Sequence, residues 1–562
     1  MPETEQAPHH RSSIKETITQ LIIAFVMAFV FRGFVIEAFL IPTGSMAPTL
    51  MGAHVNLTSD VSGYNWSMTP WVERQGGAPA NQGEFEVPDP MTQVAITAGP
   101  NEPLMGGDRI FVLKYLPYLY DPARFDCVVF KNPTNPDENY IKRLIGLPGE
   151  QVALIHGDVF VRTAPAGLEA PVDWHASGWR IARKPERVQQ ALWIPIFSSE
   201  YSPLSPMLAP NWVSPWIGTG GFEVGTEPTY VSRGSGVATI RWNDAARPID
   251  DFCAYNVRSS GLEPLRFLVP DVRIRAGVRP DAVGVAVSPI ITTCGFEIRA
   301  DIEGAGVTIR RRPVPTADGL GAREPGEWET MATGTLAAPL ATERFTDVEF
   351  WHADQAVGLV VDGRRVAYAE YDWTPAERIE HAMGRSIDDL LAAEEAYRGG
   401  RASIDIPAAL NLTQINDPHV SRNIFGVVGL YRPTTVRWEV RGAVTMTRVG
   451  LDHDLYYQST FYRGDADGPH TLENQPARGT HPEQPNLLGP DQYFTCGDNS
   501  AQSLDARLWD RPDPWVAAEL DPTMGVVPRD LLIGKAFFVY FPAMKRERPV
   551  PMIDFGRMRF IW

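Results

Sequence analysis

The sequence predicts a mainly β fold with one N-terminal apolar helix, and three observations lead to this prediction. The 49 prolines and 48 glycines among 562 residues suit many short strands joined by turns, not a helical bundle. Segments such as 296–302 alternate apolar and polar side chains, as a strand with one solvated face does. The one long apolar run lies near the N-terminus, at 18–40.

The composition is that of a globular chain with room for two substantial cores, since 44% of the residues are hydrophobic and 21% are charged. A net charge of −17 argues against a nucleic-acid partner, because phosphate binding needs a basic surface. The four cysteines lie far apart and form no Cys-x-x-Cys pair, so no metal site is expected. One or two long-range disulfides remain open among Cys127, Cys253, Cys294 and Cys496.

The N-terminal region divides into a polar tail, 1–13, and an apolar anchor, 14–40. The apolar run exceeds the about 20 residues that a helix needs to cross a bilayer. Its uninterrupted part, 21–31, is shorter, so a cleaved signal peptide is the alternative. We favour an anchor, because apolar residues continue to Leu40 and no small-x-small cleavage site ends the run. The few preceding basic residues weakly favour an N-terminus inside and the bulk of the chain outside.

Beyond the anchor, residues 51–107 show little periodicity and are expected to be an irregular insertion. Strands are predicted at 109–114, 126–131 and 140–145, and a hairpin is predicted about His156 and Gly157. Further strands are predicted at 444–457, 493–496 and 527–541. The basic run 545–548 is expected to be a solvated tail, with contact to lipid head groups as the alternative.

The long central region, 166–430, is expected to form a β-sandwich. Residues 357–371 predict a hairpin about Asp362 and Gly363. Residues 348–365 resemble part of a concanavalin-like jelly roll. One helix is predicted here, because Thr374 to Glu377 is a capping box, and Gly399–Gly400 is expected to end it.

Ser45 and Lys142 are the candidate catalytic pair. Gly44 lets the chain turn just before Ser45, but a loop serine alone is usually only a turn former. A serine hydroxyl needs a base, and His54, His156 and His352 are interpreted as turn or surface residues. A strand lysine alone is usually a solvated charge. Lys142 becomes a candidate base because burial lowers a lysine pKa and serine–lysine pairs are known.

A third segment, 497–507, is polar and would ordinarily be a loop. Its Ser503, Asp505 and Arg507 occupy alternate positions, so they can line one face of an extended chain. We expect Ser503 to hydrogen-bond and orient Lys142. We expect Asp505 and Arg507 to hold each other behind it.

Together, residues 37–50, 140–150 and 497–507 resemble three motifs of bacterial type I signal peptidase, in the family's order. Residues 126–131 match the strand before the lysine motif, with Phe125 in place of the usual glycine. The resemblance implies Ser45 as nucleophile, Lys142 as general base and an oxyanion hole made by Thr43 and the Ser45 amide. It also implies small-residue substrate pockets lined by Phe39, Ile41, Tyr140 and Ile141.

The resemblance implies a transmembrane helix followed by the family's β fold, split by the sandwich into 41–165 and 431–562. The expected activity is removal of signal peptides from exported preproteins after small-x-small sites, without a cofactor. The expected location is the inner (cytoplasmic) cell membrane, crossed once, with the catalytic part outside the cytoplasm. Expected partners are preproteins and membrane lipid, with the secretion translocon as a candidate. A tethered protein whose sandwich binds carbohydrate or a protein, with an inactive peptidase part, is the alternative.

The insert 166–430 supplies none of the residues in the three motifs. It has its own strands, a capped helix and several tryptophans, as a domain with its own core needs. We therefore expect the insert to be dispensable for the chemistry.

Overall fold

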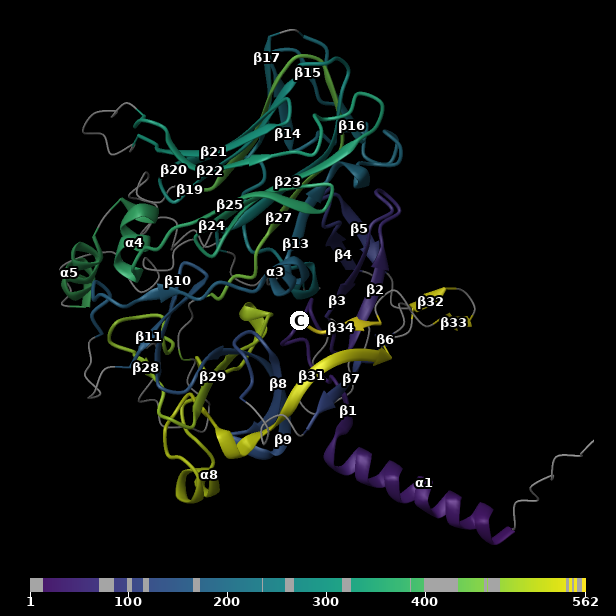
Figure 1. Ribbon diagram of the computed structural model, residues 1–562, viewed down its shortest axis with the longest axis vertical. Coiled ribbons are helices and arrows are strands. Elements are labelled where there is room, and N and C mark those ends of the chain that lie inside the picture. The colour runs from purple at the N-terminus through teal and green to yellow at the C-terminus, as the bar shows by residue number, and fades with distance from the viewer. Residues whose placement is uncertain are drawn as a thin grey trace, which may run out of the picture.

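The computed structural model shows a mainly β protein, as the sequence predicts (Figure 1). It describes residues 14–69, 85–98, 104–114, 121–164, 172–234, 236–257, 267–315, 325–384, 386–398, 433–458, 462, 476–541, 545–547, 550–552 and 558–562. The predicted polar tail, 1–13, lies outside the described residues. In Figure 1 a β-sandwich occupies the top of the molecule, a second β body lies below it, and helix α1 extends away from both.

Helix α1 (Ile14–Phe34) has 21 residues, which gives a length of about 32 Å at 1.5 Å per residue. This matches the ~30 Å hydrocarbon core of a bilayer. No part of its apolar window is buried, and it is the one helix among the described residues with the length and composition to span a membrane. Such a helix near the N-terminus is consistent with a membrane anchor or a signal sequence.

The apolar residues after α1 form a strand, so the predicted end of the anchor at Leu40 is wrong. Strand β1 (Ile36–Leu40) pairs antiparallel with β7 (Arg109–Leu113). Phe39 packs against a buried cluster, and Glu37 lies 3.0 Å from the ammonium of Lys114. Phe39 is apolar because its side of the strand meets a buried core. The sequence alone does not distinguish a side chain that meets a protein core from one that meets lipid.

An eight-stranded sheet, here called the core sheet, joins strands from both ends of the chain. Its order is β1, β7, β31 (Leu532–Phe541), β8 (Cys127–Asn132), β9 (Asn135–Gly146), β29 (Gln492–Cys496) and β30 (Val527–Pro528), with β34 (Arg559–Phe560) on β31. The predicted strand 527–541 is therefore two strands, separated by a short 3-10 turn, η5 (Arg529–Leu531). Alternate residues of β8 and β9 lie in a buried cluster, which fixes the register that pairs Val128 with Lys142.

A four-stranded sheet packs with the core sheet and contains the predicted hairpin at His156 and Gly157. Its order is β12 (Arg180–Ile181), β11 (Asp158–Thr163), β10 (Glu150–Ile155) and β28 (Asn486–Leu487). Ile155 pairs with Asp158 across the two-residue turn, so the hairpin prediction is confirmed. One apolar cluster includes side chains of both sheets, among them Phe130, Leu154 and Phe494.

Residues 51–107 are not irregular, as predicted, but contain five short strands. These are β2 (His54–Thr58), β3 (Asn65–Met68), β4 (Phe85–Pro88), β5 (Ala95–Ala98) and β6 (Leu104–Met105). Strands β2 to β5 share a buried cluster that includes Val55, Trp66 and Ile96, and β6 pairs with β2. Each strand has only two to five residues, which is too short for a periodic pattern to be recognised.

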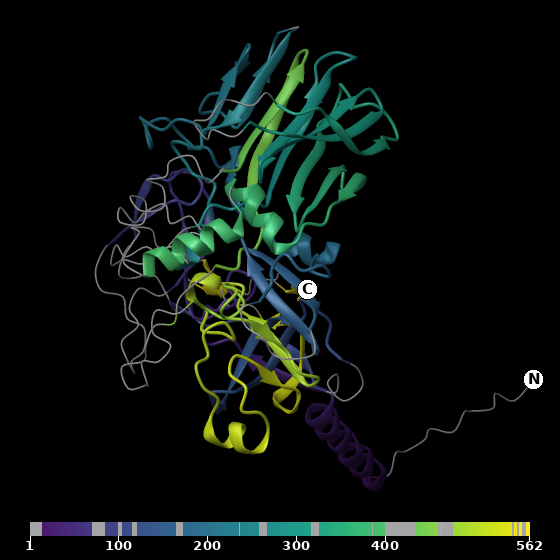
Figure 2. The ribbon, with the colours of Figure 1, turned by 90° about the vertical axis from the view of Figure 1, so that its left-hand side faces the viewer.

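The sandwich consists of two large sheets (Figure 2). One has the order β15 (Phe222–Glu223), β16 (Thr229–Ser232), β27 (Val444–His453), β18 (Val272–Pro280), β23 (Thr346–Ala353), β24 (Ala356–Val361) and β25 (Arg364–Glu370), with β13 (Ile194–Ser198) on β27. The other has the order β14 (Trp216–Thr219), β17 (Val237–Trp242), β26 (Thr435–Arg441), β19 (Ala286–Thr293), β20 (Phe296–Glu303), β21 (Gly306–Pro313) and β22 (Glu329–Thr335).

The two sandwich sheets enclose the largest core of the molecule, which includes Trp216, Trp242 and Trp438. The predicted strand at 296–302 and the hairpin at Asp362–Gly363 are both confirmed. Strands β26 and β27 lie inside the two sheets, so the sandwich does not end at residue 430, as the predicted boundary has it. The sequence pattern of β27 does not indicate whether the strand joins the sandwich or the β body below it.

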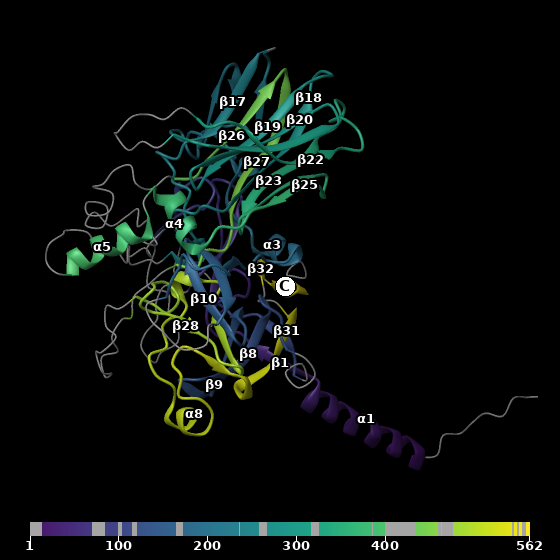
Figure 3. The same ribbon diagram turned by 60° about the vertical axis from the view of Figure 1, so that its left-hand side comes forward.

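Two helices lie at the junction between the sandwich and the body below it (Figure 3). Helix α4 (Pro375–Met383) begins with the predicted capping box of Thr374 and Glu377. It ends at Gly384, whose backbone is left-handed, and α5 (Ile387–Arg398) follows, where a single helix to Gly399 was predicted. Ile379 and Met383 pack with Phe160 of β11, so α4 fastens the insert to the four-stranded sheet.

The remaining short elements are η1 (Ser199–Tyr201), η2 (Ala254–Asn256), α3 (Glu186–Leu192), η4 (Ser500–Gln502), α8 (Pro514–Glu519), β32 (Lys545–Glu547) and β33 (Val550–Met552). Strand β32 covers most of the predicted basic tail, and Arg548 lies outside the described residues. All four cysteines are described and are free thiols, so neither of the disulfides left open by the sequence is formed.

Candidate active site

Ser45 and Lys142 meet in the structure. Ser45 lies in a turn after β1, and Lys142 lies near the buried end of β9. Nζ of Lys142 donates a hydrogen bond of 2.6 Å to Oγ of Ser45, across 97 residues of sequence. This distance permits direct proton transfer between the two groups.

The environment of Lys142 favours its neutral form. The side chain is buried, with 3% of its surface exposed. Burial lowers its pKa to about 8, although the nearby carboxylate of Asp505 acts in the opposite direction. The Tyr140 ring lies below the ammonium, with its centroid 5.3 Å from Nζ. The neutral amine is the form of a lysine that accepts a proton, and the lowered pKa makes this form more abundant than in a free lysine.

The segment after β29 holds the Ser45 turn from behind. The backbone N–H of Asn499 donates to the carbonyl of Ser45 at 3.1 Å, and its side-chain amide donates to the carbonyl of Gly44 at 3.0 Å. A Cβ on Gly497 would lie 2.4 Å from the Ser45 carbonyl oxygen, so only glycine allows this close approach. The hydroxyl of Thr49 donates to Asp498 at 2.5 Å.

A fully buried ion pair joins the lysine strand to this segment. Arg143, the residue after Lys142, donates to both carboxylate oxygens of Asp498 at 2.7 and 2.6 Å. Both side chains are 0% exposed. Arg143 also donates to the carbonyls of Phe125 and Trp562. Neither residue of the pair is assigned a role from the sequence, although both lie in the motif segments and Arg143 directly follows Lys142.

Of the three predicted supporting residues, Asp505 and Arg507 make the expected contact and Ser503 does not. Asp505 and Arg507 form the expected ion pair at 2.8 Å, and Asp505 also accepts a hydrogen bond from the Gly497 N–H. Ser503 does not orient Lys142 as expected. Its hydroxyl is buried and has no hydrogen-bond partner among the described residues, because it faces the backbone of Gly497, 2.2 Å from where a Cβ would stand.

The predicted oxyanion and pocket residues lie around the Ser45 turn. Thr43 is exposed, and none of the described residues accepts a hydrogen bond from the Ser45 N–H. Ile41 and Ile141 are 2% and 9% exposed and belong to one buried cluster, with Phe39 packed against its edge. Tyr140 is partly buried and packs against another cluster. Phe39 and Tyr140 are therefore the more accessible of the four predicted pocket residues.

The insert reaches the Ser45 turn, although it supplies none of the residues in the three motifs and is predicted from the sequence to be dispensable for the chemistry. The ring of Tyr255 lies directly over Gly44. The side-chain amide of Asn256 exchanges two hydrogen bonds of 2.7 Å with that of Asn499. These residues belong to a turn with no distinctive pattern, and no signal in the sequence places them beside Ser45.

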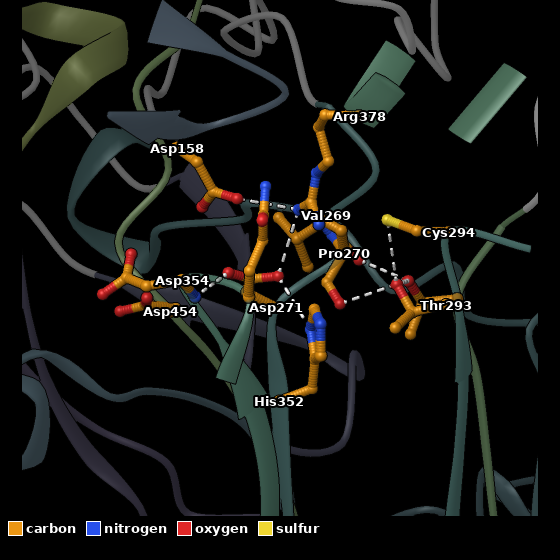
Figure 4. A network of polar contacts seen from close by, with 12 residues as sticks. Asp158, Val269, Pro270, Asp271, Thr293, Cys294, His352, Asp354, Arg378 and Asp454 are labelled. Atoms are coloured by element: carbon orange, nitrogen blue, oxygen red, sulfur yellow. Dashed lines mark hydrogen bonds and ion pairs between the residues drawn. The ribbon is translucent and has the colours of Figure 1, made fainter. Parts of the chain in front are cut away.

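A second cluster of buried charges lies where the sandwich meets the four-stranded sheet (Figure 4). Carboxylate oxygens of Asp158, Asp271 and Asp354 lie within 4.8 Å of one another, close enough to hold a metal ion. Side chains of the protein already contact their carboxylate oxygens, however. Arg378 lies 2.8 Å from Asp158, His352 lies 2.9 Å from Asp271, and Lys184 lies 2.6 Å from Asp354.

The charge cluster is therefore better suited to joining two parts of the protein than to binding a cation. Burial raises the pKa of Asp271, but His352 and Arg378 outweigh it and hold that pKa well below its usual range. His54, His156 and His352, interpreted from the sequence as turn or surface residues, are all buried. A single sequence does not show which distant carboxylate a histidine will meet.

A buried lysine in contact with a serine hydroxyl is the arrangement used by serine–lysine hydrolases. The family model described as "Signal peptidase, peptidase S26" matches residues 91–178 and 449–541. The two matched regions lie on either side of most of the β-sandwich, so the similarity to the signal peptidase S26 family is split in two along the chain. The matched regions include Lys142, Asp498 and Arg507, and they begin after Ser45.

Two curated relatives illustrate the distance of this relationship. Signal peptidase I of Rickettsia prowazekii (strain Madrid E) is 26% identical over 149 residues, which is 26% of this chain and 44% of the relative. Signal peptidase I of Buchnera aphidicola subsp. Acyrthosiphon pisum (strain APS) is 29% identical over 128 residues, which is 23% of this chain and 27% of the relative. The chain thus spans less than half the length of these relatives.

Two solved structures resemble part of the chain with low scores. The carbohydrate binding module CBM66 from Bacillus subtilis has a TM-score of 0.21 and 8% identity, over 43% of this chain and 96% of that chain. A protein of unknown function with a galectin-like fold, also from Bacillus subtilis, has a TM-score of 0.22 and 7% identity, over 44% and 92%. Scores this low do not support an inference about a ligand.

Proposed function

We propose that the chain is a membrane-anchored serine endopeptidase that removes signal peptides from exported preproteins. The observation that carries this proposal is the 2.6 Å contact between Lys142 and Ser45, on a lysine whose burial lowers its pKa. The alternative, a tethered binding protein with an inactive peptidase part, does not require these two groups to meet. The match of two chain regions to the signal peptidase S26 family model supports the same conclusion.

In the proposed reaction, neutral Lys142 takes the proton of Ser45 while Oγ attacks the carbonyl carbon of the scissile bond. The Ser45 N–H and the Thr43 hydroxyl would stabilise the negative charge on the carbonyl oxygen. Protonated Lys142 then gives the proton to the leaving amine, and the bond to nitrogen breaks. Lys142 next takes a proton from water while the water oxygen attacks the acyl–Ser45 ester. The ester bond then breaks, Lys142 gives the proton to Oγ of Ser45, and the signal peptide leaves with a free carboxyl group.

The proposed location follows from α1. With this helix across the inner membrane once, only the five-residue strand β1 and a few connecting residues separate the end of the helix from Ser45. The site is then held near the membrane surface, outside the cytoplasm, where a signal peptide leaves the bilayer. Substrate preproteins and lipid are the proposed partners, with the secretion translocon as a candidate.

A cleavage assay tests the proposal. The full chain is purified in detergent, placed in lipid vesicles and mixed with a preprotein carrying an Ala-x-Ala site. We expect one cut, after the second alanine, located by mass spectrometry of the products. A matched preprotein with tryptophan in place of that alanine is the control and should stay intact. Absence of a cut at the Ala-x-Ala site would contradict the proposed function.

The pH dependence provides a second prediction. Because the folded-state pKa of Lys142 is lowered to about 8, the lysine is mostly protonated at pH 6 and mostly neutral at pH 9. We therefore expect kcat/KM to rise about tenfold per pH unit below pH 8 and then level off. A histidine base would level off near pH 6.5 instead. The measurement is kcat/KM from about pH 5.5 to 10, and an unchanged rate over this range would contradict a lysine base.

A further inference from the structure

The insert sends one short segment, residues 251–257, into the space between the Ser45 turn and the segment after β29. This bracing segment includes the 3-10 turn η2 (Ala254–Asn256). Tyr255 and Asn256 in it are buried, with 2% and 3% of their surfaces exposed. Its side chains contact both the Ser45 turn and the segment after β29.

On the Ser45 side, Tyr255 fixes the residue before the nucleophile. A Cβ on Gly44 would lie 2.2 Å from the Tyr255 ring, so the ring occupies the place of a side chain on Gly44. Tyr255 also forms a buried apolar cluster with Ala47 and Met51. Its hydroxyl donates to the carbonyl of Ala53 at 3.1 Å. The ring thus limits the paths that the backbone can take through Ser45.

On the other side, Asn256 acts on Asn499. The two side-chain amides exchange a pair of hydrogen bonds, which fixes the rotation of the Asn499 amide. Asn499 in that rotation donates to the carbonyl of Gly44, and its backbone N–H donates to the carbonyl of Ser45. Asn256 therefore acts on the nucleophile through one intermediate side chain.

A third contact connects the same segment to the Asp505–Arg507 pair. Asp251 accepts a hydrogen bond from the Gln458 side chain. The backbone carbonyl of Gln458 accepts a hydrogen bond of 2.7 Å from the guanidinium of Arg507. The backbone N–H of Gln458 donates to the Ser500 hydroxyl. The bracing segment is therefore connected to both chain segments that position the serine–lysine pair.

We propose that Tyr255 and Asn256 are positioning residues that hold the Ser45 hydroxyl toward Lys142, so that the inserted sandwich is part of the catalytic unit. The proposal deepens the proposed function and rests on it. The proposal predicts that removal of 170–430 lowers activity even if the rest of the chain folds.

Asn256→Ala in the full chain, in vesicles, is the first test. The change leaves the buried Asn499 amide without its two hydrogen bonds to Asn256. We therefore expect kcat to fall about tenfold while KM changes less than twofold. Tyr255→Phe keeps the ring and should keep most of kcat, whereas Tyr255→Leu should lower it. Tyr230→Phe is the matched control, because this buried tyrosine also loses a hydrogen bond, to Ser214, inside the sandwich.

A double variant separates positioning from general weakening. If Asn256 acts through Asn499, the Asn256→Ala/Asn499→Ala double variant should be no slower than Asn499→Ala alone. Additive losses would show that Asn256 does not act through Asn499. A wild-type kcat in both Asn256→Ala and Tyr255→Leu would overturn the proposal while leaving the proposed function intact.

Backbone hydrogen exchange provides a readout that needs no catalysis. Asn256→Ala should raise exchange in residues 41–51 and at the Asn499 N–H, and Tyr230→Phe should not. Exchange unchanged from wild type would overturn the proposal, whether or not the chain cleaves a preprotein. If cleavage is absent even in the wild type, the proposed function fails, and the exchange result alone decides whether the bracing segment holds the turn.

Discussion

Ser45→Ala and Lys142→Ala are each expected to abolish cleavage, with kcat lowered roughly 10⁴-fold or more. Ser45→Ala removes the atom that forms the acyl intermediate. Lys142→Ala removes the group that takes its proton, which lies 2.6 Å away. Because the two residues act in one step, the double variant should be no slower than either single variant. The measurement is kcat on the Ala-x-Ala preprotein.

Neither change should unfold the protein. Ser45 lies in a partly exposed turn, so the loss of its hydroxyl leaves no large cavity. Burial of the Lys142 ammonium is unfavourable, and alanine carries no charge to bury. Two matched controls lie elsewhere on the chain. Lys131→Ala removes an exposed lysine from neighbouring strand β8, and Ser205→Ala removes a loop serine of the insert. If Ser45→Ala cleaved at the wild-type rate with an unchanged melting temperature, another residue would have to be the nucleophile.

The sequence was most informative where a short segment has a fixed chemical meaning. The resemblance to three signal peptidase motifs implies roles for Ser45 and Lys142 and includes the Asp505–Arg507 pair, and the structure forms both contacts. Hairpins were also predicted well, because a two-residue turn such as Asp362–Gly363 determines its own neighbours.

The sequence was least informative where the partner of a residue lies far along the chain. Arg143 meets Asp498 across 355 residues, and Asn256 meets Asn499 across 243. Burial and charge of single residues do not indicate such pairs. Ser503 shows the converse. Its alternate spacing groups it with Asp505 and Arg507, yet its buried hydroxyl has no hydrogen-bond partner among the described residues.

The length of a pattern set a second limit. Strands β2 to β6 are too short to produce an alternating pattern, so residues 51–107 looked irregular. Conversely, the apolar run through Leu40 continued past the end of α1, because a helix that faces lipid and a strand that faces a core select the same side chains. The boundary between them depends on pairing with β7, which is a tertiary property.

Asp498→Ala is expected to have the second-largest effect, on stability as well as activity. It leaves the guanidinium of Arg143 without its carboxylate at a site that is 0% exposed. Breaking a buried ion pair by removing one partner costs about 3–5 kcal/mol. The change also removes the acceptor of the Thr49 hydroxyl, which is one of the bonds that hold the Ser45 turn. The free energy of unfolding and kcat should therefore both fall.

A matched change at the surface isolates the effect of burial. Asp372 pairs with Arg183 at 2.7 Å, but the Asp372 side chain is 62% exposed, so Asp372→Ala should cost about 1 kcal/mol or less. A double variant, Arg143→Met with Asp498→Leu, removes both charges and should recover much of the lost stability. Activity should stay low in that variant, because Thr49 still lacks its acceptor. Equal costs for Asp498→Ala and Asp372→Ala in urea unfolding would show that the buried pair does not hold the two motif segments together.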